Sequence, residues 1–176
     1  LGRRGHELSF ALAPLCALLQ ANACSDLYSA SWILHGELER GPVAPEVIAT
    51  LGVMATRPRT ARDFAHTLLN AAHHGHDLSP AVESLRQALQ GEEALARDYA
   101  VAALTAHWTA VRSWDELKEL LRAYPGPCST ELAALASKHD WAPLVGQMHM
   151  LASSGEFYVS GEALKALTAR DAGQRS

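Results

Sequence analysis

Apolar side chains recur along this chain with the period of an α-helix, and one helical pattern occurs three times. The segments ARDFAHTLLNA at 61–71 and ARDYAVAALTA at 96–106 begin 35 residues apart, and a further step of 35 residues back reaches SDLYSASWILHGE. A unit of roughly 20 to 50 residues that recurs in this way is typical of a solenoid, in which each unit buries its apolar face only against its neighbours. The register aligns an alanine and a leucine in each copy: Ala30 and Leu34, Ala65 and Leu69, Ala100 and Leu104.

The other periodic segments pair with these copies, so the sequence predicts an all-α chain of antiparallel helix pairs. Alanine and leucine dominate and β-branched runs are few, which favours close packing of helices over strands. Asp26 can cap the second helix, Pro45 suits the first turn of the third, and Pro14 should kink or interrupt the first. Five expected helices have clear bounds: 7–20, 27–38, 46–55, 61–72 and 94–110. Another helix, between 72 and 94, is marked by Val82, Leu85 and Leu89. A fourth pair begins at Ser113 and is broken at Pro125, Gly126 and Pro127.

We expect one domain over the whole chain, with about five helix pairs. The period shortens after the fourth pair begins, because Trp114 recurs as Trp141 after 27 residues, while the segment 159–169 again resembles the central copies. End units of a solenoid have a single neighbour and are often irregular. The expected organisation of 1–176 is therefore an irregular first unit at 1–41, regular repeats at 42–112 and irregular C-terminal units at 113–176.

The repeated helix resembles the second helix of a HEAT-type repeat. Two copies carry the residues of this resemblance, which are Ala61, Arg62, Ala65, Leu68 and Leu69 in one and Ala96, Arg97, Ala100, Ala103 and Leu104 in the next. The resemblance implies a right-handed α-solenoid in which the second helices line the concave side. It also implies that Arg62 and Arg97 bond an acidic or backbone group of the adjoining repeat, with anion binding as the alternative. Asp63 and Asp98 are either the partners of these arginines or part of the outer ridge.

Opposite the apolar stripe, each repeated helix carries a ridge that we expect to form one continuous binding surface. Exposed aromatic side chains commonly anchor interfaces, so Tyr28 and Trp32 lead this prediction. The alternative, left open here, is that Trp32 packs beneath the irregular first helix. The candidate partner-binding residues are Tyr28, Trp32, His35, Asp63, Thr67, Asn70, Asp98 and Thr105.

Composition narrows the classes of partner. Hydrophobic residues make up 48% of the chain and charged residues 19%, which is typical of a soluble globular protein. The net charge of −4 lacks the basic footprint of most nucleic-acid-binding proteins. No apolar run reaches the roughly 20 residues of a membrane span, and three cysteines without a pairing motif indicate a reduced, cytoplasmic setting. The start at Leu1 suggests a piece of a longer protein.

Candidate chemistry is sparse. His73, His74 and His76 could ligate a metal, but they are crowded in one expected turn without a cysteine or an H-E-x-x-H spacing, so a solvated turn is the favoured interpretation. Cys128 follows Pro127 at an expected helix start, yet no histidine or asparagine stands beside it as for a catalytic thiol. Phosphate-binding and nucleophile motifs are absent from the sequence. We therefore expect no cofactor, no metal and no catalytic residue.

The function that follows is a protein–protein interaction scaffold that presents a concave helical-repeat surface to a protein partner. One alternative is a HEAT-like nucleic-acid enzyme of the alkylpurine DNA glycosylase type, which would require a basic concave face; the expected ridge instead carries Glu39, Asp63 and Asp98. A HEAT-like hydroxylase would require repeated His-Glu pairs, of which the chain has only His6-Glu7. A sensing or regulatory segment of a larger multidomain protein is the remaining alternative.

Overall fold

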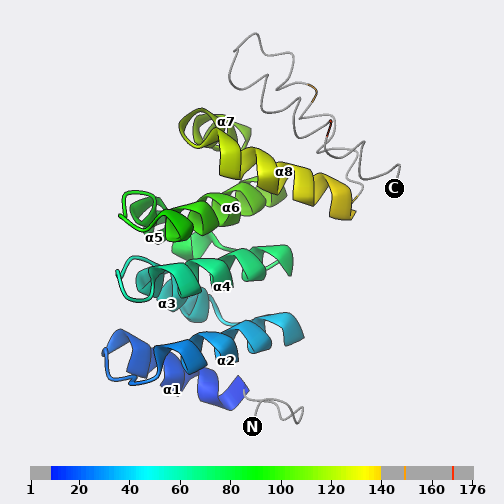
Figure 1. Cartoon of the computed structure of the whole chain (residues 1–176). Helices are drawn as coiled ribbons and strands as arrows, with labels where there is room; N and C mark the ends of the chain where they lie inside the picture. Colours follow the sequence, from blue (N-terminus) through cyan, green and yellow to red (C-terminus); the bar gives the residue numbers. More distant parts are fainter. Residues whose placement is uncertain (1–8, 140–148, 150–167, 169–176) are drawn as a thin grey trace. The chain divides into compact units, whose positions relative to one another are not determined.

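The computed structural model describes residues 9–139, 149 and 168, and within these residues the chain is helical without a strand (Figure 1). The prediction of an all-α chain is thus confirmed for the described part, whereas Trp141 and the segment 159–169, apart from Thr168, lie outside it. Eight α-helices and a short 3₁₀ helix are described: α1 Ser9–Gln20, α2 Leu27–Arg40, α3 Pro45–Ala55, α4 Ala61–His73, η2 Ser79–Ala81, α5 Val82–Ala88, α6 Ala94–Val111, α7 Trp114–Ala123 and α8 Pro125–His139.

Local sequence signals account for most helix boundaries. The Asp26 carboxylate accepts a hydrogen bond from the Ser29 backbone N–H at 3.0 Å, so the expected cap of α2 is formed. Pro45 occupies the first turn of α3, where its missing N–H has no intrahelical partner to lose. After α4, Gly75 adopts a φ of 80°, a left-handed conformation that favours glycine and ends the helix.

The expectations about prolines were met in part. Pro14 is exposed within α1 and the helix continues through it, so the predicted interruption is absent, while the alternative of a kink stays a prediction. The fourth pair is divided near the expected place, since α7 ends at Ala123, but Pro125, Gly126 and Pro127 form the first turn of α8, and only Tyr124 separates the two helices. The reason is positional, since the first backbone N–H groups of a helix have no intrahelical acceptor and proline therefore removes no bond there.

The chain divides into two compact units, one that ends at Leu104 and one that begins at Thr105, so that α6 contributes residues to both. In the first unit α3 is central and packs against α1, α4, η2 and α5, while α2 packs against α4. Odd-numbered helices thus contact one another in one layer, and α2 and α4 contact each other in a second layer (Figure 1).

The repeated alanines lie in the core of the first unit. Ala30, Ala65 and Ala100 are 2%, 0% and 0% exposed, and the leucines Leu34 and Leu104 are fully buried. A small side chain at this position lets a neighbouring helix approach closely. Gly52 on α3 serves the same purpose, because a Cβ atom there would lie 3.0 Å from the Ala81 Cβ atom of η2.

Two connecting segments are bonded to helices about one repeat earlier in the chain. The Arg57 guanidinium, in the α3–α4 turn, donates to the Leu19 and Gln20 carbonyl oxygens at 3.0 and 3.3 Å. The His76 Nε2 atom, in the segment after α4, lies 2.8 Å from the Leu38 carbonyl oxygen of α2. These side chains bond carbonyl groups at helix C-termini, where the intrahelical ladder ends. The Leu19 oxygen also accepts the Asn22 backbone N–H at 3.1 Å.

Arg62 and Arg97 make structural bonds, and Arg62 pairs with Asp63, but the prediction that these bonds reach the adjoining repeat was wrong. Arg62 Nε donates to Asp63 Oδ1 at 3.1 Å, and an Arg97 guanidinium nitrogen donates to the Gly91 carbonyl oxygen at 3.2 Å. Both bonds stay within one helix pair because each acceptor lies on the same helix or in the turn just before it. Arg57 fulfils the expected role instead.

In the second unit α7 packs against α8. The α7 leucines Leu117, Leu120 and Leu121 are buried, as the apolar stripe of this helix predicts. Cys128 of α8 is also fully buried, and the Thr105 hydroxyl donates a hydrogen bond to its Sγ atom at 3.2 Å. Among residues 9–139, 149 and 168, none of the helices combines the length and the hydrophobicity that a bilayer span requires.

Candidate functional site

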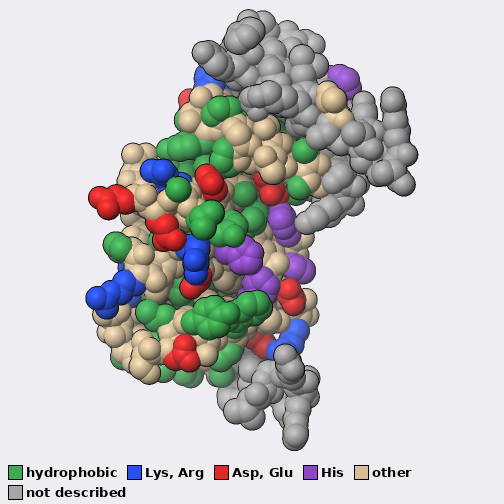
Figure 2. All heavy atoms as spheres, in the orientation of Figure 1, with side chains coloured by type: hydrophobic (Ala, Val, Ile, Leu, Met, Phe, Trp, Pro, Cys, Tyr) green, Lys and Arg blue, Asp and Glu red, His purple; other side chains and the backbone are tan. Residues whose placement is uncertain are grey.

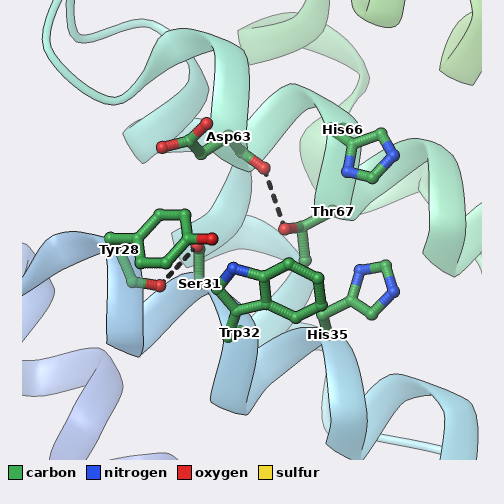
Figure 3. A pocket seen from close by; sticks show the side chains of 7 residues that line it. All are labelled: Tyr28, Ser31, Trp32, His35, Asp63, His66 and Thr67. Atoms are coloured by element: carbon green, nitrogen blue, oxygen red, sulfur yellow. Dashed lines mark hydrogen bonds between the residues drawn. The ribbon is translucent and has the colours of Figure 1, made fainter.

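The outward faces of α2 and α4 enclose a small pocket in the first unit, with a volume of about 90 Å³ (Figure 3). The two helices pack against each other, and the residues on the exposed side of that contact form the walls. Seven residues line the pocket: Tyr28, Ser31, Trp32 and His35 from α2, and Asp63, His66 and Thr67 from α4.

The α2 wall is aromatic. Tyr28 and Trp32 are one helical turn apart and project from the same face, with ring centroids 6.1 Å apart and planes inclined at 70° in an edge-to-face contact. Their side chains are 62% and 57% exposed, so Trp32 does not pack beneath α1 as the alternative interpretation required. Ser31 beside them is buried, and its hydroxyl donates to the Tyr28 carbonyl oxygen at 2.8 Å.

The α4 wall is short and polar. Asp63, His66 and Thr67 lie three and four residues apart, so one face of the helix carries all three. Thr67 is almost fully buried, and its hydroxyl donates to the Asp63 carbonyl oxygen at 2.9 Å. The Asp63 side chain is 32% exposed and accepts the Arg62 bond at Oδ1. Figure 3 shows these short side chains facing the larger rings of α2.

A row of rings extends from the pocket across three helices of the first unit. The Trp32 and His35 rings have centroids 5.6 Å apart, and the His35 and His66 rings stack at 5.8 Å with planes only 16° apart. His66 then contacts Tyr99 of α6 at 4.9 Å. Figure 2 shows histidine side chains gathered beside exposed hydrophobic ones on this face. We call Tyr28, Trp32, His35, His66 and Tyr99 the ring row.

The electrostatics of the ring row favour an uncharged His66. Partial burial is the main cause that lowers the pKa of His66, the neighbouring His35 and His73 lower it further, and Asp63 opposes them. A lowered pKa keeps His66 neutral at pH 7. At the other end of α2, His35 Nε2 lies 3.3 Å from Glu39 Oε1, whose side chain is half exposed. Two carboxylates thus lie beside the ring row, Glu39 close to His35 and Asp63 paired with Arg62.

Five of the eight predicted binding residues line the pocket, namely Tyr28, Trp32, His35, Asp63 and Thr67. The others do not. Asn70 lies further along α4, where its carbonyl oxygen is 2.9 Å from His74 Nδ1 and its buried Nδ2 atom has no partner among the described residues. Asp98 is exposed on α6. Thr105 belongs to the second unit and is fully buried, so the prediction that it lies on the surface was wrong.

Sequence reasoning missed three contributors, Ser31, His66 and Tyr99. Two of them could have been found from the 35-residue register. Ser31 and His66 are equivalent in the repeat, and each directly precedes a predicted binding residue, Trp32 or Thr67. Tyr99 stands instead at the repeat position of Phe64, which is fully buried, whereas Tyr99 is half-buried. Its ring contact with His66 had no sequence signal.

Within the described residues, no group of three or more histidine, cysteine, aspartate or glutamate side chains is arranged to hold a metal ion. His74 and His76 each have a ring nitrogen within hydrogen-bond distance of a backbone carbonyl oxygen, of Asn70 and Leu38 respectively. The pocket itself brings together aromatic rings, a carboxylate and imidazoles, which can recognise a ligand without a covalent step.

Comparisons of the chain with protein-family models, with curated proteins and with solved structures found no match.

Proposed function

We propose that the chain is a HEAT-like α-solenoid segment that binds a protein partner through the face formed by α2 and α4. The observation that carries this proposal is the exposed Tyr28–Trp32 pair beside a pocket. Large aromatic side chains that cluster on the surface around a concavity are the usual anchors of protein interfaces.

The repeat part of the proposal is supported by the inner face of the helices. Ala30, Ala65 and Ala100 recur every 35 residues and are all buried, and α2 and α4 each follow a partner helix of the other layer. Such helix pairs bury their apolar stripes on one another and leave the outer ridges free for binding.

The binding part is supported by the energetics of the exposed rings. Fully burying a large apolar side chain contributes roughly 1.5–3 kcal/mol, and Tyr28 and Trp32 leave more than half of their surface in water. The core of the first unit is filled by other residues, such as Leu34 and Phe64, which are fully buried. The two rings therefore contribute little to folding, and a partner that covers them gains most of their burial energy.

The experiment is an affinity capture from the source cells with three forms of the chain, followed by mass spectrometry and by affinity measurement with the purified partner. We expect Trp32→Ala to weaken binding by about tenfold or more, as at a hot spot. The matched control is Leu18→Ala, which removes a 48%-exposed side chain from α1, away from the pocket. Both variants should keep the wild-type melting temperature within a few degrees, on the order of 1 kcal/mol.

A protein retained by the wild type and by Leu18→Ala but lost by Trp32→Ala supports the proposal. Equal capture by all three forms would place binding elsewhere. Recovery of nucleic acid that depends on Trp32 would instead favour the nucleic-acid enzyme.

A further inference from the structure

We infer that the pocket between α2 and α4 receives a basic side chain, arginine or lysine, of the partner protein. This inference rests on the proposed function and specifies its chemistry. It is carried by three properties of the pocket, which are its aromatic wall, its carboxylate and its size.

The aromatic wall suits a cation. Tyr28 and Trp32 are inclined at 70°, so they form a corner in which a group can lie over one ring face and against the other ring's exposed surface. A lysine ammonium or an arginine guanidinium within about 6 Å of an indole or phenol centroid is attracted by the negative face of the ring. Arginine gains further contact because its planar guanidinium stacks on aromatic faces.

The opposite wall supplies negative charge. Asp63 lines the pocket, and its recorded ion pair with Arg62 uses Oδ1, so that Oδ2 has no bonded partner among the described residues. Arg62 itself does not line the pocket and is 53% exposed. Glu39, about two turns along α2 from Trp32, lies beside His35 outside the pocket, so Asp63 is the carboxylate that lines it. A charge-assisted hydrogen bond to such a carboxylate is stronger than a neutral one.

The remaining polar groups of the pocket favour a ligand that donates hydrogen bonds over an anionic ligand that accepts them. A neutral imidazole has one acceptor nitrogen, and His66 offers it at the pocket wall. The hydroxyl protons of Ser31 and Thr67 are already donated to backbone carbonyl oxygens, which leaves their oxygens as acceptors. A phosphate or carboxylate ligand would need several donors here, and lysine and arginine side chains do not line the pocket.

The size of the pocket selects the end of a side chain. A volume of about 90 Å³ accommodates an ammonium or guanidinium group, whereas pockets for whole drug-sized ligands run from about 300 to 1,000 Å³. The aliphatic stem of lysine or arginine can then lie along the exposed rings, as such stems do on apolar surfaces. The occupant is therefore part of a peptide segment whose other residues lie across the α2–α4 face.

The test is an NMR titration of the full chain with short peptides, followed at the Trp32 indole N–H, whose signal is assigned with Trp32→Phe. One peptide carries a central arginine, and its matched form carries citrulline, which has nearly the same shape without the charge. A second pair carries lysine or N-acetyl-lysine. We expect saturable shifts with the arginine and lysine peptides and at least fivefold weaker binding of the neutral forms, which is the scale of a cation–π contact joined by a carboxylate.

Asp63→Asn should weaken binding of the arginine peptide several-fold, whereas Asp63→Glu should retain most of it. The matched control is Asp98→Asn, because Asp98 occupies the equivalent position of the next repeat and does not line the pocket. Far-UV circular dichroism verifies that each variant is folded. Equal binding of arginine and citrulline peptides, absence of any shift, or equal losses in Asp63→Asn and Asp98→Asn would overturn the inference.

The two proposals fail separately. A cellular partner lost with Trp32→Ala, combined with no preference for charged peptides, would retain the binding face and overturn the cationic ligand. A charge preference without any Trp32-dependent protein partner would retain the cation pocket and overturn the scaffold function.

Discussion

The helices α2 and α4 are copies of the same repeat. Their inner faces have the same residue at the equivalent position, whereas their outer faces have different residues. At the inner position both have an alanine, Ala30 and Ala65, and both are buried. At the outer position α2 has Trp32, 57% exposed, whereas α4 has Thr67, 2% exposed. Close packing restricts the inner residue in each copy, and the outer residue is free to differ. In the pocket, Tyr28 and Trp32 of α2 lie across from Asp63 and Thr67 of α4, which have shorter side chains (Figure 3).

The largest effect is expected from a charge at the inner position. Ala65→Glu would place an unpaired carboxylate where the native side chain is 0% exposed, and we expect a loss of about 3 kcal/mol or more in the free energy of unfolding. Denaturant unfolding followed by circular dichroism measures this loss.

The matched change at the outer position is Tyr28→Glu. Tyr28 is 62% exposed, so the same carboxylate remains in water and stability should stay within about 0.5 kcal/mol of the wild type. Comparable losses in the two variants would show that the inner and outer faces are assigned wrongly.

Much of the helical frame could be predicted from sequence because it depends on local chemistry. The spacing of apolar residues located α2, α4 and α6, and the buried alanine of each copy followed from the 35-residue register. The exposed pair Tyr28 and Trp32 followed from the same register, since residues four apart share a helix face. The arrangement of the helix pairs as a HEAT-like solenoid stays a prediction.

The contacts between helices were harder to predict, since they depend on side-chain rotamers and on which helix lies alongside. The His35–His66 stack joins residues that the register places at different repeat positions. Thr105 matched the outer ridge by spacing, but in the folded chain its hydroxyl bonds the buried Cys128 of α8. The hydrogen bond from Arg57 to α1 could not be predicted either, because Arg57 lies in a turn outside the repeated helix that contains Arg62.

An intermediate effect is expected from Arg57→Ala, which tests what holds the first helix pair to the pair that contains α4. The variant removes the donors to the Leu19 and Gln20 carbonyl oxygens, and we expect a loss of roughly 1–2 kcal/mol. Urea unfolding should give a lower midpoint with an unchanged m-value.

Arg62→Ala is the control for the loss of an arginine. Arg62 is exposed and its partner Asp63 is the next residue, so we expect this ion pair to contribute little to stability. If both variants lose the same stability, the bonds from Arg57 to α1 do not hold the helix pairs together.

The smallest effect is expected from the pH dependence of stability that His66 introduces. Its pKa is lowered in the folded chain, chiefly by partial burial and then by His35, and returns to about 6.5 on unfolding. Below that value the unfolded chain therefore binds the proton first. Stability should be unaffected well above pH 6.5 and should fall as the pH drops through 6.5 toward the lowered value. Because His66 is partly exposed, the loss should be about 0.5 kcal/mol or less.

The two stacked imidazoles, His35 of α2 and His66 of α4, can be replaced one at a time, so their separate contributions to the pH dependence can be measured. His66→Gln removes the titrating group and should flatten the slope of unfolding free energy against pH between about 5 and 7. His35→Gln removes the neighbouring charge and should reduce the slope without abolishing it, since burial is the larger cause. A slope that is as steep in His66→Gln as in the wild type would mean that the ring stack does not control the titration.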